Sequence, residues 1–526
     1  MVRYTFRRLL RWYFAVPISV VVVGLSIPVV YLTVRGLGAD PDRIATLVFS
    51  VRNARLLANT VLLAAGVLVV GSFVAFPLAW LTSRTDLRPR GVYTVVGVLP
   101  LAVPGYVLAY VILGITGSYG TLARHFGLDV PTLSGYWGAL LALSLYTSPY
   151  LFLNLRAAMM RLDPSLEEAA RSLGYGRRMV LLRVTLPQLR PAFLAGALLV
   201  VLHVMGDFGV VSLMRYETFS LAIYIQFAAA FDRTYAALLA LMLLALTAVV
   251  LVVEARLLGN LRLDGVGTGS GTITPLGKWK ALGVSYCVVF GIVSAGIPLA
   301  SILGWALGGD GAGISALGRP LWNAVTASAP AAVTATLIAL PITYLSTRFP
   351  SRVTRVIERV SYLGYAIPPL ALALAYIFFA LSAAPGLYQT LALLIFVYTL
   401  HFVAEAIGPL RSAFFQAPAH VEEAARSLGR SPLRAFVAAT LPLIRTGIVV
   451  SLAFVFLSAL KELPLTILLA PPGFETLSLN VWTYTNEAMF ADAAPYAIAI
   501  IALSGLFVGL LIRHERTDGL RPLLHK

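Results

Sequence analysis

Apolar runs of about 20 residues recur along the whole chain, and runs of this length are typical of helices that cross a membrane. The composition agrees, with 59% hydrophobic residues, 12% charged residues and a mean hydropathy of +0.86. Soluble domains carry about a quarter charged residues. We therefore predict an all-α membrane protein with about twelve transmembrane helices. The predicted spans are 14–34, 56–82, 91–115, 135–156, 191–213 and 236–255, followed by 281–305, 322–345, 360–382, 389–410, 445–470 and 492–512.

The basic residues are distributed unevenly about these spans. Of the 40 Lys and Arg residues, 31 lie on the side of the N-terminus, eight lie on the other side, and Lys461 lies within a span. This asymmetry follows the positive-inside rule, so the net charge of +17 does not indicate a nucleic-acid partner. An even number of spans returns the C-terminus to the side of the N-terminus, and the positive-inside rule makes this side the cytoplasm. The basic C-terminal tail agrees, with Arg513, Arg516, Arg521 and Lys526.

A short charged segment occurs twice in this apolar chain. The first copy is Glu168–Gly174, and the same seven residues return 255 positions later as Glu423–Gly429. Each copy is followed by a Leu-Pro pair that ends at Pro187 or Pro442. In the first copy Asp163 is a good helix N-cap, and the glycine that ends each segment suits the residue just past a helix. We predict a short helix-turn-helix in each half.

The repeat extends beyond these segments. The matched pairs are Asn59 with Asn323, Pro104 with Pro368, and Glu217 with Glu475. Each half has six predicted spans, so both halves have the same orientation in the membrane, as in a parallel repeat. We expect a first unit at 1–256 with its charged loop at 157–190, a cytoplasmic linker at 257–280, and a second unit at 281–526 with its loop at 411–444.

Two interpretations of the charged loops remain. In the first, each is a solvated loop stabilised by pairs four residues apart, Glu167 with Arg171 and Glu422 with Arg426. In the second, they form a duplicated docking surface for a two-fold partner. The recurrence of both the spacing and the terminal Leu-Pro favours docking.

The loops resemble the cytoplasmic signature of permease subunits of ATP-binding-cassette importers. That signature is Glu-Ala-Ala, three residues, Gly, nine residues, an aliphatic residue, any residue, and Leu-Pro; Ala439 is its one weak match here. The resemblance implies the fold of a type I ABC importer permease, with two permease units fused in one chain. It also implies that each loop docks on one subunit of an ATPase homodimer at the cytoplasmic side of a bacterial inner membrane. The positions that match are Glu168, Ala169, Ala170, Gly174 and Pro187, and Glu423, Ala424, Ala425, Gly429 and Pro442.

This resemblance further implies that a binding protein delivers the substrate from outside, and that the two glutamates of the signature make ionic contacts with the ATPase. Gly277-Lys278 does not form a phosphate-binding loop, because Thr272 and Trp279 stand where glycine and Ser or Thr are required. We therefore expect no enzyme activity and no cofactor in this chain, with ATP and Mg used by the partner ATPase. Cys287 is the single cysteine, which excludes a disulfide or a cysteine zinc site within the chain.

Asp207 and Glu462 are related by the same offset of 255 and are expected near the outer end of a span. Acids inside spans are costly and are candidates for a substrate pathway, here for a cation. Alternatively, both acids mark the point at which a helix ends. His203 with Asp207, and His401 with Glu405, share a helix face and suggest buried hydrogen-bonded pairs more than a metal site.

Runs around these acids, such as Met205–Val211 and Lys461–Thr466, resemble the permeases of ferric iron importers. Ferric iron is therefore the expected substrate, while thiamine, polyamine and phosphonate importers remain alternatives. A secondary transporter driven by an ion gradient also fits twelve spans. It would need a coupling acid or base near the bilayer midplane. The metal ligands, if any, are not assigned.

Overall fold

The structure is a computed structural model that describes residues 12–38, 40–258, 273–308 and 313–520, the last fourteen of them by their backbone alone. All the regular elements in this part of the chain are helices, as predicted. The first half contains α2 (Trp12–Leu37), α3 (Pro41–Val48), α4 (Val51–Arg84), α5 (Arg90–Val98), α6 (Gly105–Ile115), α7 (Thr121–Phe126), α8 (Gly135–Arg161), α9 (Pro164–Ser172), α10 (Arg177–Val180), α11 (Leu186–Gly206), α12 (Gly209–Leu213), α13 (Phe219–Ala228) and α14 (Arg233–Leu258).

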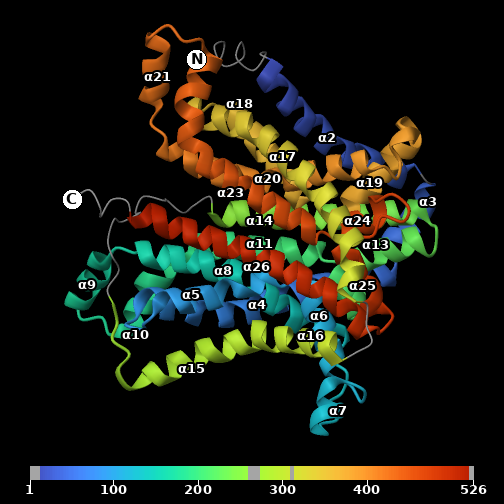
Figure 1. Ribbon diagram of the computed structural model, residues 1–526, viewed down its shortest axis with the longest axis horizontal. Helices are drawn as coiled ribbons and strands as arrows, with labels where there is room; N and C mark the ends of the chain where they lie inside the picture. Colours follow the sequence, from blue (N-terminus) through green and yellow to red (C-terminus); the bar gives the residue numbers. More distant parts are fainter. Residues whose placement is uncertain (1–11, 39, 259–272, 309–312, 521–526) are drawn as a thin grey trace.

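The second half repeats this order with little change. It contains α15 (Lys280–Gly291), α16 (Ile297–Gly308), α17 (Gly318–Arg348), α18 (Arg352–Ala366), α19 (Pro369–Ala383), α20 (Leu391–Gln416), α21 (Ala419–Ser427), α22 (Pro432–Ala435), α23 (Leu441–Lys461), α24 (Pro464–Leu469), α25 (Leu477–Asn486) and α26 (Phe490–Leu520). The long helices lie side by side along the long axis of the molecule (Figure 1).

Nine helices in the described part of the chain are long and apolar enough to cross a membrane, and two bent helix pairs bring the number to eleven. The apolar part of α26, Phe490–Leu506, is a twelfth segment, and the predicted span 492–512 continues past it beyond the described side chains. The predicted linker falls largely on residues 259–272, which lie outside the described residues, as do the side chains of the basic tail.

The spans predicted at 91–115 and 360–382 each consist of two helices joined at a sharp bend. The chain bends by 87° between η1 (Leu99–Ala102) and α6, and by 98° between α18 and α19. A proline, Pro104 or Pro368, follows the bend in each half. The residue before it, Val103 or Ile367, has extended backbone because the proline ring disfavours a helical conformation there. The spans 191–213 and 445–470 are also interrupted, since α11 ends at Gly206 and α23 at Lys461.

The first helix of each half packs against the other half. Helix α2 lies against α17, α18 and α19, and the Tyr376 hydroxyl of α19 donates to the Gly24 carbonyl of α2 at 2.7 Å. Helices α15 and α16 lie along α5 and α6 (Figure 1), and the Tyr286 hydroxyl of α15 donates to the Val74 carbonyl at 3.0 Å. The two sequence halves are thus interlocked by an exchange of first helices.

The repeat predicted from sequence is confirmed by a matched pair of hydrogen bonds. The Asn59 side chain donates to the Glu217 carbonyl at 2.8 Å, and Asn323 donates to the Glu475 carbonyl at 2.9 Å. Each bond joins the second long helix of a half to the loop before α13 or α25.

Replacing Asn59 or Asn323 by alanine should lower the free energy of unfolding by about 1 kcal/mol at each site, because one hydrogen bond is lost. The effects should be similar and additive, since the sites lie in different halves. Thermal unfolding of the detergent-purified single and double variants measures this. A large effect at one site with none at the other would contradict the symmetry.

The described end of the linker is fastened to the end of α4. The Thr274 amide donates to the Arg84 carbonyl at 2.8 Å, and the Leu276 amide donates to Asp86 Oδ1 at 2.9 Å. The Leu276 amide holds the pKa of Asp86 below its usual value, and Lys280, 3.7 Å away, acts in the same direction. The second half therefore starts from a fixed point on the first.

Candidate docking helices and the polar cluster between the halves

The two charged loops fold as predicted. Helix α9 begins after Asp163, whose carboxylate accepts from the Ser165 amide at 2.9 Å, and this bond lowers the pKa of Asp163. Gly174 and Gly429 follow α9 and α21 with φ of 86° and 83°, a conformation that glycine adopts without strain. We call α9 and α21 the loop helices.

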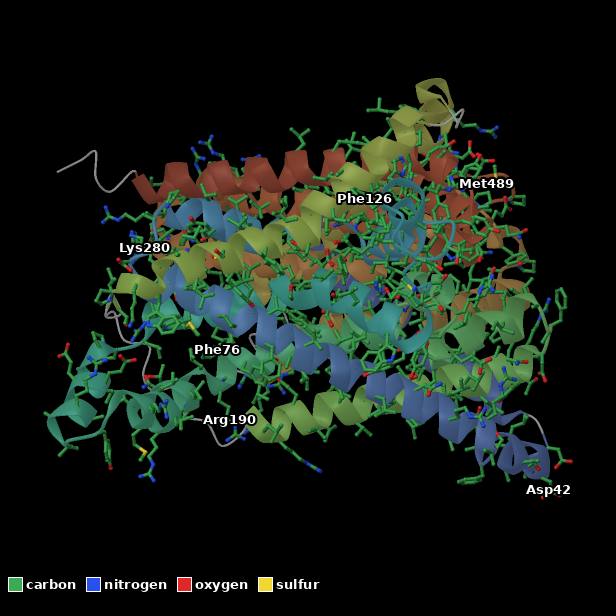
Figure 2. All side chains as sticks on the ribbon, turned by 90° about the horizontal axis from the view of Figure 1, so that it is seen from below. Asp42, Phe76, Phe126, Arg190, Lys280 and Met489 are labelled. Atoms are coloured by element: carbon green, nitrogen blue, oxygen red, sulfur yellow. The ribbon has the colours of Figure 1, made fainter. Side chains whose placement is uncertain are left out.

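Both loop helices lie at the same end of the molecule (Figure 1), and α2 begins and α26 ends there as well. Arg190 and Lys280 lie toward this end, whereas Asp42, Phe126 and Met489 lie toward the opposite one (Figure 2). This arrangement agrees with the predicted asymmetry of the basic residues.

The exposed faces of the loop helices match. Glu168 and Glu423 are exposed, and in the described structure neither carboxylate has a partner within the chain. Leu173 and Leu428, which close the two helices, are 77% and 85% exposed. A leucine and a carboxylate that stay exposed at equivalent positions of both halves are typical of an interaction surface.

Glu167 and Glu422, which directly precede the exposed Glu168 and Glu423, have a different role that was not predicted from the sequence. Glu167 is buried. Its carboxylate accepts hydrogen bonds from Arg84 at 2.6 Å and from the Thr185 hydroxyl at 3.0 Å. The predicted pair with Arg171 is present but long, at 3.9 Å. Glu167 therefore ties α9 to α4 and to η2 (Leu181–Thr185).

Glu422 is buried in the same way in the second half. It accepts from the Tyr344 hydroxyl at 2.6 Å and from the Thr440 hydroxyl at 2.8 Å. The predicted pair with Arg426 was wrong for the described structure, because Tyr344 and Thr440 occupy the carboxylate. Both threonines end a π-helical turn, η2 or η7 (Phe436–Thr440), and such turns are frequent at functional sites. A glutamate and a threonine 18 residues apart in both copies were the available sequence signal.

Asp207 and Glu462 lie at the ends of α11 and α23 that point away from the loop helices. The Asp207 carboxylate accepts from the Val210 amide at 2.8 Å, and Glu462 accepts from the Leu465 amide at 3.2 Å. Both acids thus begin the short helices α12 and α24, so they mark helix ends as the alternative interpretation held. The structure nevertheless brings the two carboxylates within electrostatic range of each other.

Around these acids, equivalent positions of the two halves form what we call the central polar cluster. Its members are Tyr146, Tyr150, His203 and Asp207 of the first half and His401, Glu405, Ser458 and Glu462 of the second, each pair 255 residues apart. The Tyr146 and His203 rings lie 4.9 Å apart, and Glu405 acts electrostatically on Tyr150 across the two halves. The cluster therefore lies where α8 and α11 face α20 and α23.

The predicted hydrogen bonds within the His203–Asp207 and His401–Glu405 pairs were wrong. In the described residues His401 Nδ1 instead contacts the Gly364 carbonyl at 2.8 Å, because α18 lies against this face of α20. No group of three or more His, Cys, Asp or Glu side chains is arranged to hold a metal in the part of the chain that the structure describes.

Acidic side chains predominate in the central polar cluster. The carboxylates of Asp207, Glu405 and Glu462 are each half-buried and interact electrostatically. Lys461 supplies one ammonium group near Glu405. Acidic side chains within a membrane-spanning bundle are costly, and they are therefore candidates for the lining of a polar route.

The sequence matches the family of binding-protein-dependent transport system inner membrane components twice, at residues 67–261 and 335–514. The chain belongs to this family. As a permease it is 32% identical over 518 residues to the Fe(3+)-transport system permease protein FbpB 2 of Haemophilus influenzae, covering 95% of this chain and 98% of that protein.

Shorter relatives match parts of the permease. A probable molybdenum ABC transporter permease protein of Haloferax volcanii is 33% identical and covers 34% of this chain and 67% of its own length. A putative 2-aminoethylphosphonate transport system permease protein, PhnV, of Salmonella paratyphi A is 30% identical, and the match covers 46% of this chain and 96% of that protein. A solved bacterial ABC transporter involved in alginate import has a TM-score of 0.36 at 18% identity, covering 47% of this chain and 88% of that one.

The two family matches place one loop helix in each permease domain, α9 in the first and α21 in the second. This confirms the prediction of an ATP-binding-cassette importer permease in which two homologous units are fused. Such permeases are multi-pass inner membrane proteins without an ATP site of their own. Helix α2 precedes the first matched region, in keeping with its packing against the opposite half.

Proposed function

We propose that this permease forms the membrane pathway of an ATP-driven importer for ferric iron. A binding protein delivers iron to the end that carries α13 and α25, and an ATPase homodimer binds the loop helices at the other, cytoplasmic end. Both chain termini lie on the cytoplasmic side, and the units are those expected from sequence, 1–256 and 281–526 joined by 257–280. The observation that carries the proposal is the pairing of two exposed loop helices with an acidic cluster between the halves.

The loop helices support the site of ATPase binding. Exposed Glu168 and Glu423 offer a charge, and exposed Leu173 and Leu428 offer apolar contact area. We assign the docking contacts to Glu168, Ala169, Gly174 and Pro187 and to Glu423, Ala424, Ala425, Gly429 and Pro442. Ala170, which the family signature also includes, is buried and packs α9 against the permease. ATP closes the ATPase dimer, and the closed dimer favours the arrangement of the permease that brings the loop helices together.

The charges of the central polar cluster support a cationic cargo. The shorter relatives are named for molybdenum and 2-aminoethylphosphonate. A phosphonate and the oxyanion of molybdenum both carry anionic oxygens, which a cluster of acidic side chains disfavours. Ferric iron is a hard cation that prefers oxygen ligands such as carboxylates, and the acids of the cluster supply carboxyl oxygens.

Reconstitution tests this function directly. The permease is placed in proteoliposomes with its ATPase, ATP inside, and the ferric-loaded binding protein outside. We expect iron uptake that requires both ATP and the ATPase. Uptake without the ATPase, or uptake of molybdate or 2-aminoethylphosphonate in place of iron, would overturn the proposal.

Replacing Asp207 by Asn and Glu462 by Gln should slow iron uptake by about ten-fold in the double variant, because two of the three carboxylates lose their charge. The amide side chains keep an oxygen that can accept the Val210 and Leu465 amides, so the short helices should persist. Initial uptake rates in the same proteoliposomes measure the effect. Unchanged rates would leave both acids as helix-end residues alone.

A further inference from the structure

Lys461 breaks the symmetry of the central polar cluster. Its equivalent in the first half is Gly206, so one half places a long cationic side chain where the other has none. A Cβ atom at Gly206 would lie 3.1 Å from Pro369, at the bend between α18 and α19. The end of α11 therefore packs directly on the bend of the second half.

The end of α23 reaches the bend of the first half in the same way, but here the contact is made by Lys461. Its ammonium donates to the Leu101 carbonyl in η1 at 3.2 Å, at the bend of the first half. Its own carbonyl accepts from the Tyr106 hydroxyl of α6 at 3.3 Å. Lys461 is therefore bonded to the opposite half by both its side chain and its backbone.

The electrostatic surroundings of Lys461 come from both halves. Glu405 on α20 attracts the ammonium, and His203 on α11 also lies within its field. The next residue, Glu462, interacts with Glu405 and Asp207. Lys461 thus supplies the positive charge opposite three carboxylates, in the region where the halves meet.

We propose that Lys461 is a built-in cation that latches the two halves together across the pathway. A cationic cargo takes the place of its ammonium group beside the carboxylates. This inference rests on the proposed function for the nature of the cargo. In the latched state the ammonium reduces the negative charge of the cluster and holds the end of α23 on η1. When the halves separate, the bond to Leu101 breaks and the carboxylates are exposed to the cargo.

The test measures ATP hydrolysis by the permease–ATPase complex in nanodiscs without a binding protein. Lys461→Met removes the charge but keeps an unbranched apolar chain, and it should raise this basal rate by about ten-fold, because a hydrogen bond from a charged group no longer favours the latched state. Lys461→Arg should restore the low rate. Lys278→Met, which removes an exposed lysine of the short helix Gly277–Trp279, is the matched control and should leave the rate unchanged.

Glu405→Gln provides the second arm. In the Lys461→Met background it should change the basal rate little, because the ammonium that Glu405 attracts is already gone, whereas in the wild type it should raise the rate. A basal rate in Lys461→Met within two-fold of the wild type, with the complex intact, would overturn the latch. If the wild-type complex takes up no iron, iron is not the cargo, but the latch is still tested, because the basal rate is measured without any cargo.

Discussion

Replacing Glu168 and Glu423 together by lysine is expected to reduce ATP-driven uptake by about 100-fold or more, because charge reversal at a buried interface contact costs several kcal/mol at each of two equivalent sites. Both carboxylates are exposed and serve no partner within the chain in the described structure. The substitutions should therefore leave the fold intact. We expect their effect to fall on the proposed contact with the ATPase.

Glutamine at both positions is the matched comparison, because it keeps the size of the side chain and removes only the charge. We expect an intermediate loss of uptake. Co-purification of the ATPase with the permease reports docking, and uptake in proteoliposomes reports coupling. Retention of both by the double lysine variant would show that the loop helices do not dock through these residues.

The second large effect is expected from alanine at Glu167 and Glu422. Glu167→Ala leaves Arg84 without the carboxylate that it contacts at 2.6 Å, and breaking a buried ion pair in this way costs about 3–5 kcal/mol. Glu422→Ala removes two hydrogen bonds to a charged acceptor, from Tyr344 and Thr440, at about 1.5–3 kcal/mol each. The loop helices should then loosen from α4 and α17, to which these glutamates bind.

The measurement separates this effect from docking. Amide hydrogen exchange should become faster in α9 and α21, and uptake should fall, while the ATPase still binds to the intact exposed face. Thr185→Val and Thr440→Val each remove one hydrogen bond and should have the same effect more weakly, at about 1 kcal/mol. Protection of α9 that is unchanged in Glu167→Ala would contradict the anchoring role.

The sequence was sufficient for the elements whose cause is local or repeated. Runs of apolar residues predicted the helices, and the offset of 255 residues predicted that α9 and α21 are equivalent. The capping by Asp163 and the turns at Gly174 and Gly429 followed from side-chain chemistry.

Other features depend on contacts between distant residues, which periodicity does not report. The burial of Glu167 depends on Arg84, 83 residues earlier, and the contact of Lys461 depends on Leu101, 360 residues earlier. The bends had a local signal that was not used. Pro104 and Pro368 were visible in the sequence and had been paired as a repeat, but the apolar runs around them concealed the breaks.

The exchange of first helices determines which parts can move as one piece. The hydrogen bonds of Tyr376 to Gly24 and of Tyr286 to Val74 fasten α2 and α15 to the half that does not encode them. The linker therefore does not separate the parts of the permease that are fastened together. Any rigid body that moves during transport is therefore a hybrid, which carries the first helix of the other half.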